Sequence, residues 1–217
     1  MFEYDPNGNL VKDGLKRLEF SYNCLNLMQT AKTASGALKA QFIHSPDGRK
    51  LSEKARTGGF EYLGSLIYTY RGGILDLVQA VTDEGTIQLA GVNYFIRDHL
   101  GSVRAVVDHT GKIVERNDYY PFGGRHQNSA LSLSATNRYK FGGKETLEPV
   151  SLDMLDFGAR FYDPRIARWN TQDRYAEKYP SVSPYSYCAN NPINITDPTG
   201  DTLRLSIDGQ TYRVDRQ

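Results

Sequence analysis

A short turn unit recurs along the first half of the sequence. In each copy, an aromatic or β-branched lead is followed by an Asp/Asn-x-x-Gly/Asn turn and then by an apolar residue. Asp and Asn side chains can accept a hydrogen bond from the backbone two residues on, and glycine adopts positive φ, so the unit reverses the chain between strands. The copies are YDPNGNLV (4–11), SYNCLNLM (21–28), FIHSPDGRKL (42–51), FIRDHLGSV (95–103) and VVDHTGKIV (106–114). The first three recur at roughly 20-residue intervals, a spacing that suits two strands per repeat.

The repeat and the composition together predict an all-β fold, a strip of β-hairpins with about ten strands. The chain has 15 Tyr, 9 Phe and 20 Gly among its 217 residues, and these residue types favour strands and turns. The clearest hairpin is SVRAVVDHTGKIVER at 102–116, with its turn at Asp108 to Gly111. Residues 86–97 are expected to form one strand, with Gly91 at a bulge.

The second half of the chain has a different character. Residues 123–138 are polar and aperiodic, which predicts an exposed loop. Short helical turns are expected within 152–162 and 174–179, and a hairpin is expected in the tail, 201–217. The region after residue 156 is dense in Pro, Asn and Tyr, which disfavours regular strands, so specific side-chain contacts must hold it.

Charge and motif content exclude several functions. The 26 basic and 25 acidic residues nearly cancel, so neither nucleic acid nor a membrane surface is an expected partner. Neither a signal peptide nor a membrane span is expected from this sequence, because its first residues are acidic and no apolar run is long enough. Cys24 and Cys188 match no metal or redox spacing, and a disulfide between them is possible but disfavoured. No cofactor or metal is expected, because the four histidines are scattered near turns: His44, His99, His109 and His126.

The motifs, in this order and at these spacings, resemble the bacterial Rhs or YD-repeat family, in particular its C-terminal repeat-associated core domain. The resemblance covers essentially residues 4–200. It is carried by YDPNGNL at 4, by YFIRDHLGSVRAVVDHTGKIVERNDYYPFG at 94–123, by NRYKFGGKE at 137–145, and by GARFYDPRIARWNTQD through SPYSYCANNPINITDPTG at 158–200. It implies a β-strip (1–122), the polar loop (123–138), a core domain (139–200) and a variable tail or effector stub (201–217).

The resemblance also implies a function. Such strips spiral into a hollow shell that encloses a variable C-terminal effector, and the core domain resembles an aspartyl autoprotease that cuts just after the DPxG motif. Matched by motif, the catalytic residues would be Arg160, Asp173 and Asp197. Two neighbouring carboxylates cannot both ionise easily, so they provide one acid and one base, and an arginine can polarise the scissile carbonyl.

Two positions depart from the family pattern. Arg174 follows the first aspartate, where proline is common, and Asp201 follows DPTG, where an apolar residue is common. The three site residues also have simpler interpretations. Asp197 fits the first position of a type I turn, Asp173 could cap a short helix, and Arg160 could form a surface pair with Asp163 or Asp156.

The expected partners are the rest of a shell, a C-terminal effector and a cognate immunity protein or secretion component. The chain would then be a secreted or cell-surface fragment of a longer protein. One alternative is a non-catalytic β-repeat module for cell-surface contact or for carbohydrate binding through an exposed aromatic row. Another is a glycosidase with paired carboxylates in an open cleft. The aromatic residues in question are Tyr119, Tyr120, Phe122, Tyr185 and Tyr187, which could equally be core; Trp169 is expected to be a packing anchor.

Overall fold

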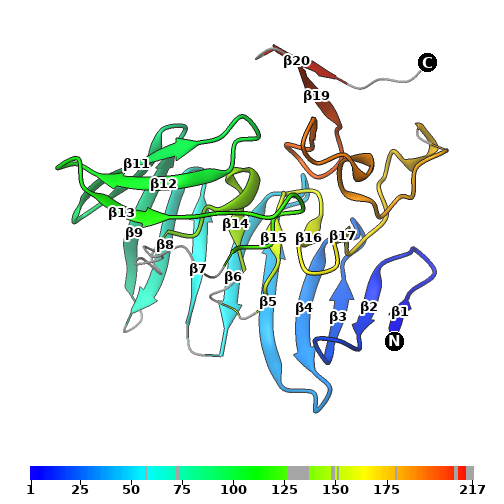
Figure 1. Cartoon of the computed structure of the whole chain (residues 1–217). Helices are drawn as coiled ribbons and strands as arrows, with labels where there is room; N and C mark the ends of the chain where they lie inside the picture. The colour runs from blue at the N-terminus through cyan, green and yellow to red at the C-terminus, as the bar shows by residue number, and fades with distance from the viewer. Residues whose placement is uncertain are drawn as a thin grey trace.

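A computed structural model describes residues 1–56, 58–71, 74–126, 137–147, 150, 152–178, 180–207 and 210–213. Within these residues, thirteen strands follow one another in chain order across one antiparallel, strongly curled sheet (Figure 1). The strands are β1 (Phe2–Tyr4), β2 (Leu10–Asp13), β3 (Leu18–Tyr22), β4 (Met28–Thr33), β5 (Leu38–His44), β6 (Lys50–Ala55), β7 (Gly58–Leu63), β8 (Leu66–Arg71), β9 (Ile74–Thr82), β10 (Gly85–Gln88), β11 (Gly91–Arg97), β12 (Val103–Asp108) and β13 (Ile113–Arg116).

Two smaller antiparallel sheets follow in the described part of the chain. The first contains β14 (Glu145–Thr146), β15 (Leu155–Asp156), β16 (Phe161–Asp163) and β17 (Arg168–Trp169), and the second contains β18 (Ile195–Thr196), β19 (Arg204–Ile207) and β20 (Gln210–Arg213). The helical segments described are single 3-10 turns: η1 (Phe141–Gly143), η3 (Ala176–Lys178) and η4 (Tyr187–Asn190). The all-β prediction is therefore confirmed.

The recurring unit forms the hairpin turns that the sequence predicts. In the β1–β2 turn, Asp5 Oδ1 accepts hydrogen bonds from the N–H groups of Asn7 and Asn9, at 2.9 and 2.8 Å. Asp98 and Asp108 accept the same pair of bonds, from the second and fourth residues after each. The fourth position of each turn has positive φ: 76° at Gly8, 58° at Asn26, 87° at Gly48, 82° at Gly101 and 87° at Gly111.

Several local predictions are corrected by the structure. Residues 86–97 are not one strand but the hairpin of β10 and β11, in which Leu89 and Ala90 turn the chain although neither is a typical turn former. Residues 152–162 contain β15 and the start of β16 instead of a helical turn, because Leu155 and Asp156 pair with residues that follow a tight bend. The helical turn expected within 174–179 is the 3-10 turn η3, and the predicted hairpin in the tail is β19 with β20.

The second sheet and the loops around it cover one face of the N-terminal strands. Side chains on this face alternate with exposed ones along β3 and β5, as the two-residue period of a strand requires. Together with residues between β14 and β16, they form one hydrophobic core: Leu10, Leu18, Phe20, Met28, Ala31, Ala40, Phe42, Leu147, Val150, Leu152, Met154 and Phe161.

Buried ion pairs also join the thirteen-stranded sheet to the described residues of 137–169, which contain β14 to β17 and which we call the covering segment. Lys50 Nζ on β6 lies 3.2 Å from Glu53, 2.7 Å from Glu145 and 2.7 Å from Asp156. Arg138 donates to Glu53 at 2.8 Å and also pairs with Glu145. We call these five residues the charge cluster.

Two further buried pairs have the same role, Lys16–Asp163 at 2.7 Å and Lys140–Glu115 at 2.6 Å. Of the loop expected at 123–138, residues 127–136 lie outside the described residues. The two residues at its end are not exposed: Asn137 is 9% and Arg138 is 6% exposed.

We predict that Lys50→Met lowers the free energy of unfolding by about 3 to 5 kcal/mol, because it leaves buried carboxylates without their main cation. Urea unfolding measures this change. The matched control is Lys12→Met, which removes the exposed pair with Glu3 and should leave the midpoint nearly unchanged. Equal midpoint shifts for the two variants would show that the charge cluster does not stabilise the packing of the covering segment on the thirteen-stranded sheet.

Candidate functional site

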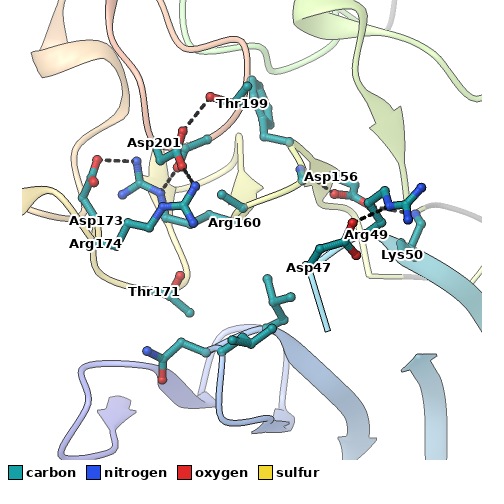
Figure 2. A pocket seen from close by; sticks show the side chains of 18 of the residues that line it. Asp47, Arg49, Lys50, Asp156, Arg160, Thr171, Asp173, Arg174, Thr199 and Asp201 are labelled. Atoms are coloured by element: carbon teal, nitrogen blue, oxygen red, sulfur yellow. Dashed lines mark hydrogen bonds and ion pairs between the residues drawn. The ribbon is translucent and has the colours of Figure 1, made fainter. Parts of the chain in front are cut away.

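The structure brings the three predicted site residues together from distant parts of the core. Arg160 immediately precedes β16, Asp173 follows β17 and Asp197 follows β18. Arg160 Nη2 lies 2.7 Å from Asp173 Oδ2 and 3.4 Å from Asp197 Oδ2, so one guanidinium nitrogen bridges the two carboxylates. Figure 2 shows Arg160 beside Asp173 at one side of a cleft.

Asp197 forms the same turn as the hairpin aspartates of the strip. Its Oδ1 accepts from Thr199 and Asp201, the second and fourth residues on, and also from Gly200 and Thr202, at distances between 2.8 and 3.3 Å. Gly200 has φ +84° at the fourth position. The turn interpretation is therefore correct, but Asp197 also has a contact outside the turn. Asp197 is only 1% exposed, and its second oxygen faces Arg160.

Asp173 likewise has two roles. Its Oδ1 accepts from the Tyr175 N–H at 2.8 Å and its carbonyl accepts from the Ala176 N–H, so it begins the 3-10 turn η3 as the capping interpretation expects. Its Oδ2 remains for Arg160.

The expectation that Arg160 forms a surface pair with Asp163 or Asp156 is wrong. Arg160 is 5% exposed, and those two carboxylates pair with Lys16 and Lys50 instead. Arg160 Nη1 also donates to the Pro184 carbonyl at 3.1 Å, and its guanidinium lies 4.3 Å from the centre of the Trp169 ring.

Both ends of one peptide bond contact these residues. Arg160 Nε donates to the carbonyl oxygen of Gly200, and the N–H of Asp201 donates to Asp197 Oδ1 at 3.0 Å. A Cβ at Gly200 would lie 3.1 Å from both the backbone nitrogen of Arg160 and Cβ of Phe157, so glycine lets the loop approach Arg160 closely. The Gly200–Asp201 bond is therefore polarised at its carbonyl by a cation and held at its nitrogen by a carboxylate.

Burial sets the protonation of the site. It raises the pKa of Asp197 above its ordinary value, although the backbone N–H of Thr202 and the Arg160 guanidinium oppose the rise. Burial also lowers the pKa of Arg160, against the opposing effect of the neighbouring carboxylates. For Asp201, burial is outweighed by hydrogen bonds from Thr199 and Arg174, so its pKa falls below the ordinary value. Burial thus moves Asp197 towards its protonated form, whereas the hydrogen bonds of Asp201 move that carboxyl away from it.

A cleft of about 1110 Å³ opens beside the site. One wall consists of the β1–β2, β3–β4 and β5–β6 turns, and the other consists of loops at 156–160, 171–175 and 199–202. Asp173 lines the cleft and Asp197 does not. A glycosidase needs both carboxylates at an open cleft, so the burial of Asp197 argues against that alternative.

The aromatic residues pack mainly as core. Trp169, 1% exposed, is the predicted packing anchor, and it contacts Tyr187 with ring centroids 5.5 Å apart. Tyr119 and Phe122 pack partly buried against the same cluster. Tyr185 contacts Tyr4 in a tilted arrangement, with ring centroids 5.3 Å apart, and Tyr120 is 58% exposed. These five side chains, Tyr119, Tyr120, Phe122, Tyr185 and Tyr187, therefore do not form an exposed row.

Two contacts of the loop after β18, at residues 197–203, were not predicted from the sequence. Lys144 Nζ donates to the Pro198 carbonyl at 2.6 Å, and nothing local in the sequence indicates this contact across 54 residues. Arg174 pairs with Asp201, so the two departures from the family pattern contact each other. Their opposite charges were the signal that could have revealed this pair.

The remaining observations concern the cysteines, possible metal ligands and membrane spans. Cys24 is exposed and Cys188 is buried, and both are free thiols, so no disulfide joins them. Among the residues that the structure describes, no group of three or more His, Cys, Asp or Glu side chains is placed to hold a metal ion. In the same part of the chain, no helix has the length and apolar character needed to span a membrane.

We predict that Asp197 makes stability depend on pH. Because the folded-state pKa of this acid is raised, the folded state binds more protons than the unfolded state above pH 3.8, and the contribution of Asp197 to stability falls as pH rises through the folded pKa. Asp197→Asn should remove this component. Urea unfolding from pH 3 to 8 should therefore show the stability of the wild type falling relative to the variant as pH rises. A constant difference would contradict the raised pKa.

Comparisons with known proteins agree with the fold. The sequence profile described as "Teneurin YD-shell" matches residues 1–193. "Salivary gland surface protein 1" of Aedes aegypti is 37% identical over 115 residues, which are 52% of this chain and 3% of that protein. "Toxin subunit YenC1" of Yersinia entomophaga is 30% identical over 111 residues, 50% of this chain and 11% of that protein.

A solved structure, "Crystal Structure of TcdB2-TccC3-Cdc42", superimposes with a TM-score of 0.73 at 19% identity, covering 91% of this chain and 11% of the solved chain. At that identity the likeness concerns the fold alone. The chain spans about a tenth or less of the length of these relatives. The profile match over 193 of 217 residues, with the thirteen-stranded sheet of the described residues, places the chain in the teneurin YD-shell family.

Proposed function

We propose that this chain is the self-cleaving end of a YD-type shell, which cuts its own backbone between Gly200 and Asp201. One observation carries the proposal: Arg160 contacts the carbonyl of that bond, and Asp197 contacts its nitrogen. Asp173, on the other side of Arg160, faces the cleft from which water can reach the bond.

The chemistry is peptide hydrolysis by a carboxyl pair. Asp173 takes a proton from a water molecule in the cleft, and the water oxygen forms a bond to the carbonyl carbon of Gly200. Arg160 stabilises the negative charge that develops on the carbonyl oxygen. The C–N bond then breaks, and Asp197, in the protonated form that burial favours, gives its proton to the departing nitrogen of Asp201. Transfer of a proton from Asp173 to Asp197 restores the starting state.

The wider role is part of the same proposal. The chain would form the closing wall of a shell whose other strands come from a longer protein, and the segment after Gly200 would lead into a variable effector enclosed by that shell. Support comes from the family of shell proteins and from a relative named as a toxin subunit. The expected partners are thus the remaining shell, the effector and an immunity or secretion component, with action outside the producing cell.

To test cleavage, a folded reporter protein is attached after Gln217 and the purified protein is followed by denaturing gel and mass spectrometry. We expect two fragments, with Asp201 as the new N-terminal residue, and a rate that falls as pH rises through the raised pKa of Asp197. Asp173→Asn and Asp197→Asn should each slow the cut by at least about 100-fold.

The matched control is Asp108→Asn. Asp108 makes the same turn bonds in the β12–β13 hairpin but lies away from Arg160, so its loss should leave the rate unchanged. An intact wild-type protein over days, indistinguishable from Asp197→Asn, would remove the autoprotease from the proposal.

A further inference from the structure

A second charged pair lies against the proposed cut site. Asp201, the residue after the bond, is 6% exposed, and its Oδ1 accepts from the hydroxyls of Thr199 at 2.6 Å and Thr202 at 3.0 Å. Arg174 Nη2 donates to its Oδ2. Figure 2 shows Arg174 and Asp201 joined beside Arg160, with Thr199 on the other side of the carboxylate.

The charges explain why this pair matters. Arg160 interacts with the carboxylates of Asp173, Asp197 and Asp201, and one guanidinium cannot balance all of them. Arg174 supplies a second cation, so two guanidinium groups face the carboxyl groups of Asp173, Asp197 and Asp201. Without Arg174, an uncompensated carboxylate would be covalently attached to the bond being cut, where it would repel the oxyanion and favour protonation of its neighbours.

The geometry adds a positional effect. The N–H groups of Asp201 and Thr202 both donate to Asp197 Oδ1, at 3.0 Å each, and the Asp201 side chain is the part of this segment that Arg174 holds. Arg174 itself is 66% exposed at the side chain, and its guanidinium lies 5.2 Å from the Tyr175 ring centre. An exposed residue of this kind can be replaced without opening the core.

We propose that Arg174 is a positioning residue for the cut, which neutralises Asp201 and holds the Gly200–Asp201 bond against Asp197 and Arg160. This role rests on the proposed self-cleavage. The family commonly has an apolar residue after DPxG, and in this chain the Asp201–Arg174 pair takes its place. Asp201 and Arg174 then function as one unit: a buried charge at this position is tolerated only with its cation.

The test is a double-mutant cycle in the reporter fusion. Arg174→Ala should slow the cut by about 10-fold to 100-fold through misplacement of the bond, and Arg174→Lys should restore most of the rate. In an Asp201→Leu background, Arg174→Ala should change the rate by less than about 2-fold, because no charge remains to neutralise. Arg174→Ala should also move the alkaline limb of the pH profile to higher pH, a shift that simple loosening of the loop would not cause.

Arg104→Ala is the matched control. Arg104 is also an exposed arginine that pairs with an aspartate, Asp118, and lies near a tyrosine ring, that of Tyr119, but on β12 far from the loop in sequence. We expect it to leave the rate and the pH profile unchanged. A wild-type rate for Arg174→Ala, or an equal slowing in the Asp201→Leu background, overturns the proposal.

Amide hydrogen exchange gives a readout that does not need cleavage. The amides of Asp201 and Thr202 should exchange at least about 10-fold faster in Arg174→Ala than in the wild type, because local opening becomes easier. This measurement separates the two proposals. If the wild type is never cut but these amides lose protection, self-cleavage fails and the positioning contact stands. Unchanged protection in Arg174→Ala overturns the positioning contact, whatever the cleavage result.

Discussion

The salt bridges of Lys50 join the thirteen-stranded sheet to the segment that covers it, beside the hydrophobic core that the two share. Arg160, Asp173 and Asp197 all lie after the thirteen-stranded sheet, in a part of the chain whose strands are short. Lys50 contributes a cation from β6, and the covering segment contributes the carboxylates of Glu145 and Asp156. Asp156 lies four residues before Arg160 in the sequence. Because unpaired buried charges are so costly, such a cluster tolerates few alternative registers between the two parts.

One turn geometry serves both the scaffold and the candidate site. Asp108 and Asp197 accept nearly the same set of backbone hydrogen bonds, and each is followed at the fourth position by a glycine with positive φ. Only the surroundings differ. Asp108 lies at the tip of an exposed hairpin, whereas Asp197 is buried against Arg160. Burial and one arginine, not a new backbone conformation, distinguish the site aspartate from a structural one.

The sequence allowed the repeating turns, the all-β class and the meeting of Arg160, Asp173 and Asp197 to be predicted, because each depends on local turn chemistry or on motif resemblance. It did not allow the charge cluster to be predicted. Lys50 and Glu145 are 95 residues apart, and nothing near either residue indicates the other. The β10–β11 hairpin was also missed, because Leu89 and Ala90 carry no turn signal and the strand pairing decides the conformation there.

The position of Gly200 within a hairpin has a consequence for what a cut would produce. Ile195 pairs with Leu205 and Thr196 with Arg204, so β18 and β19 flank the Gly200–Asp201 bond and hydrogen-bond to each other. Leu203, 8% exposed, packs into the protein just after the bond. Hydrolysis there would change the covalent connectivity of the chain while leaving these contacts in place. The two products would be a complementation pair, separate in a denaturing gel and joined in a native one.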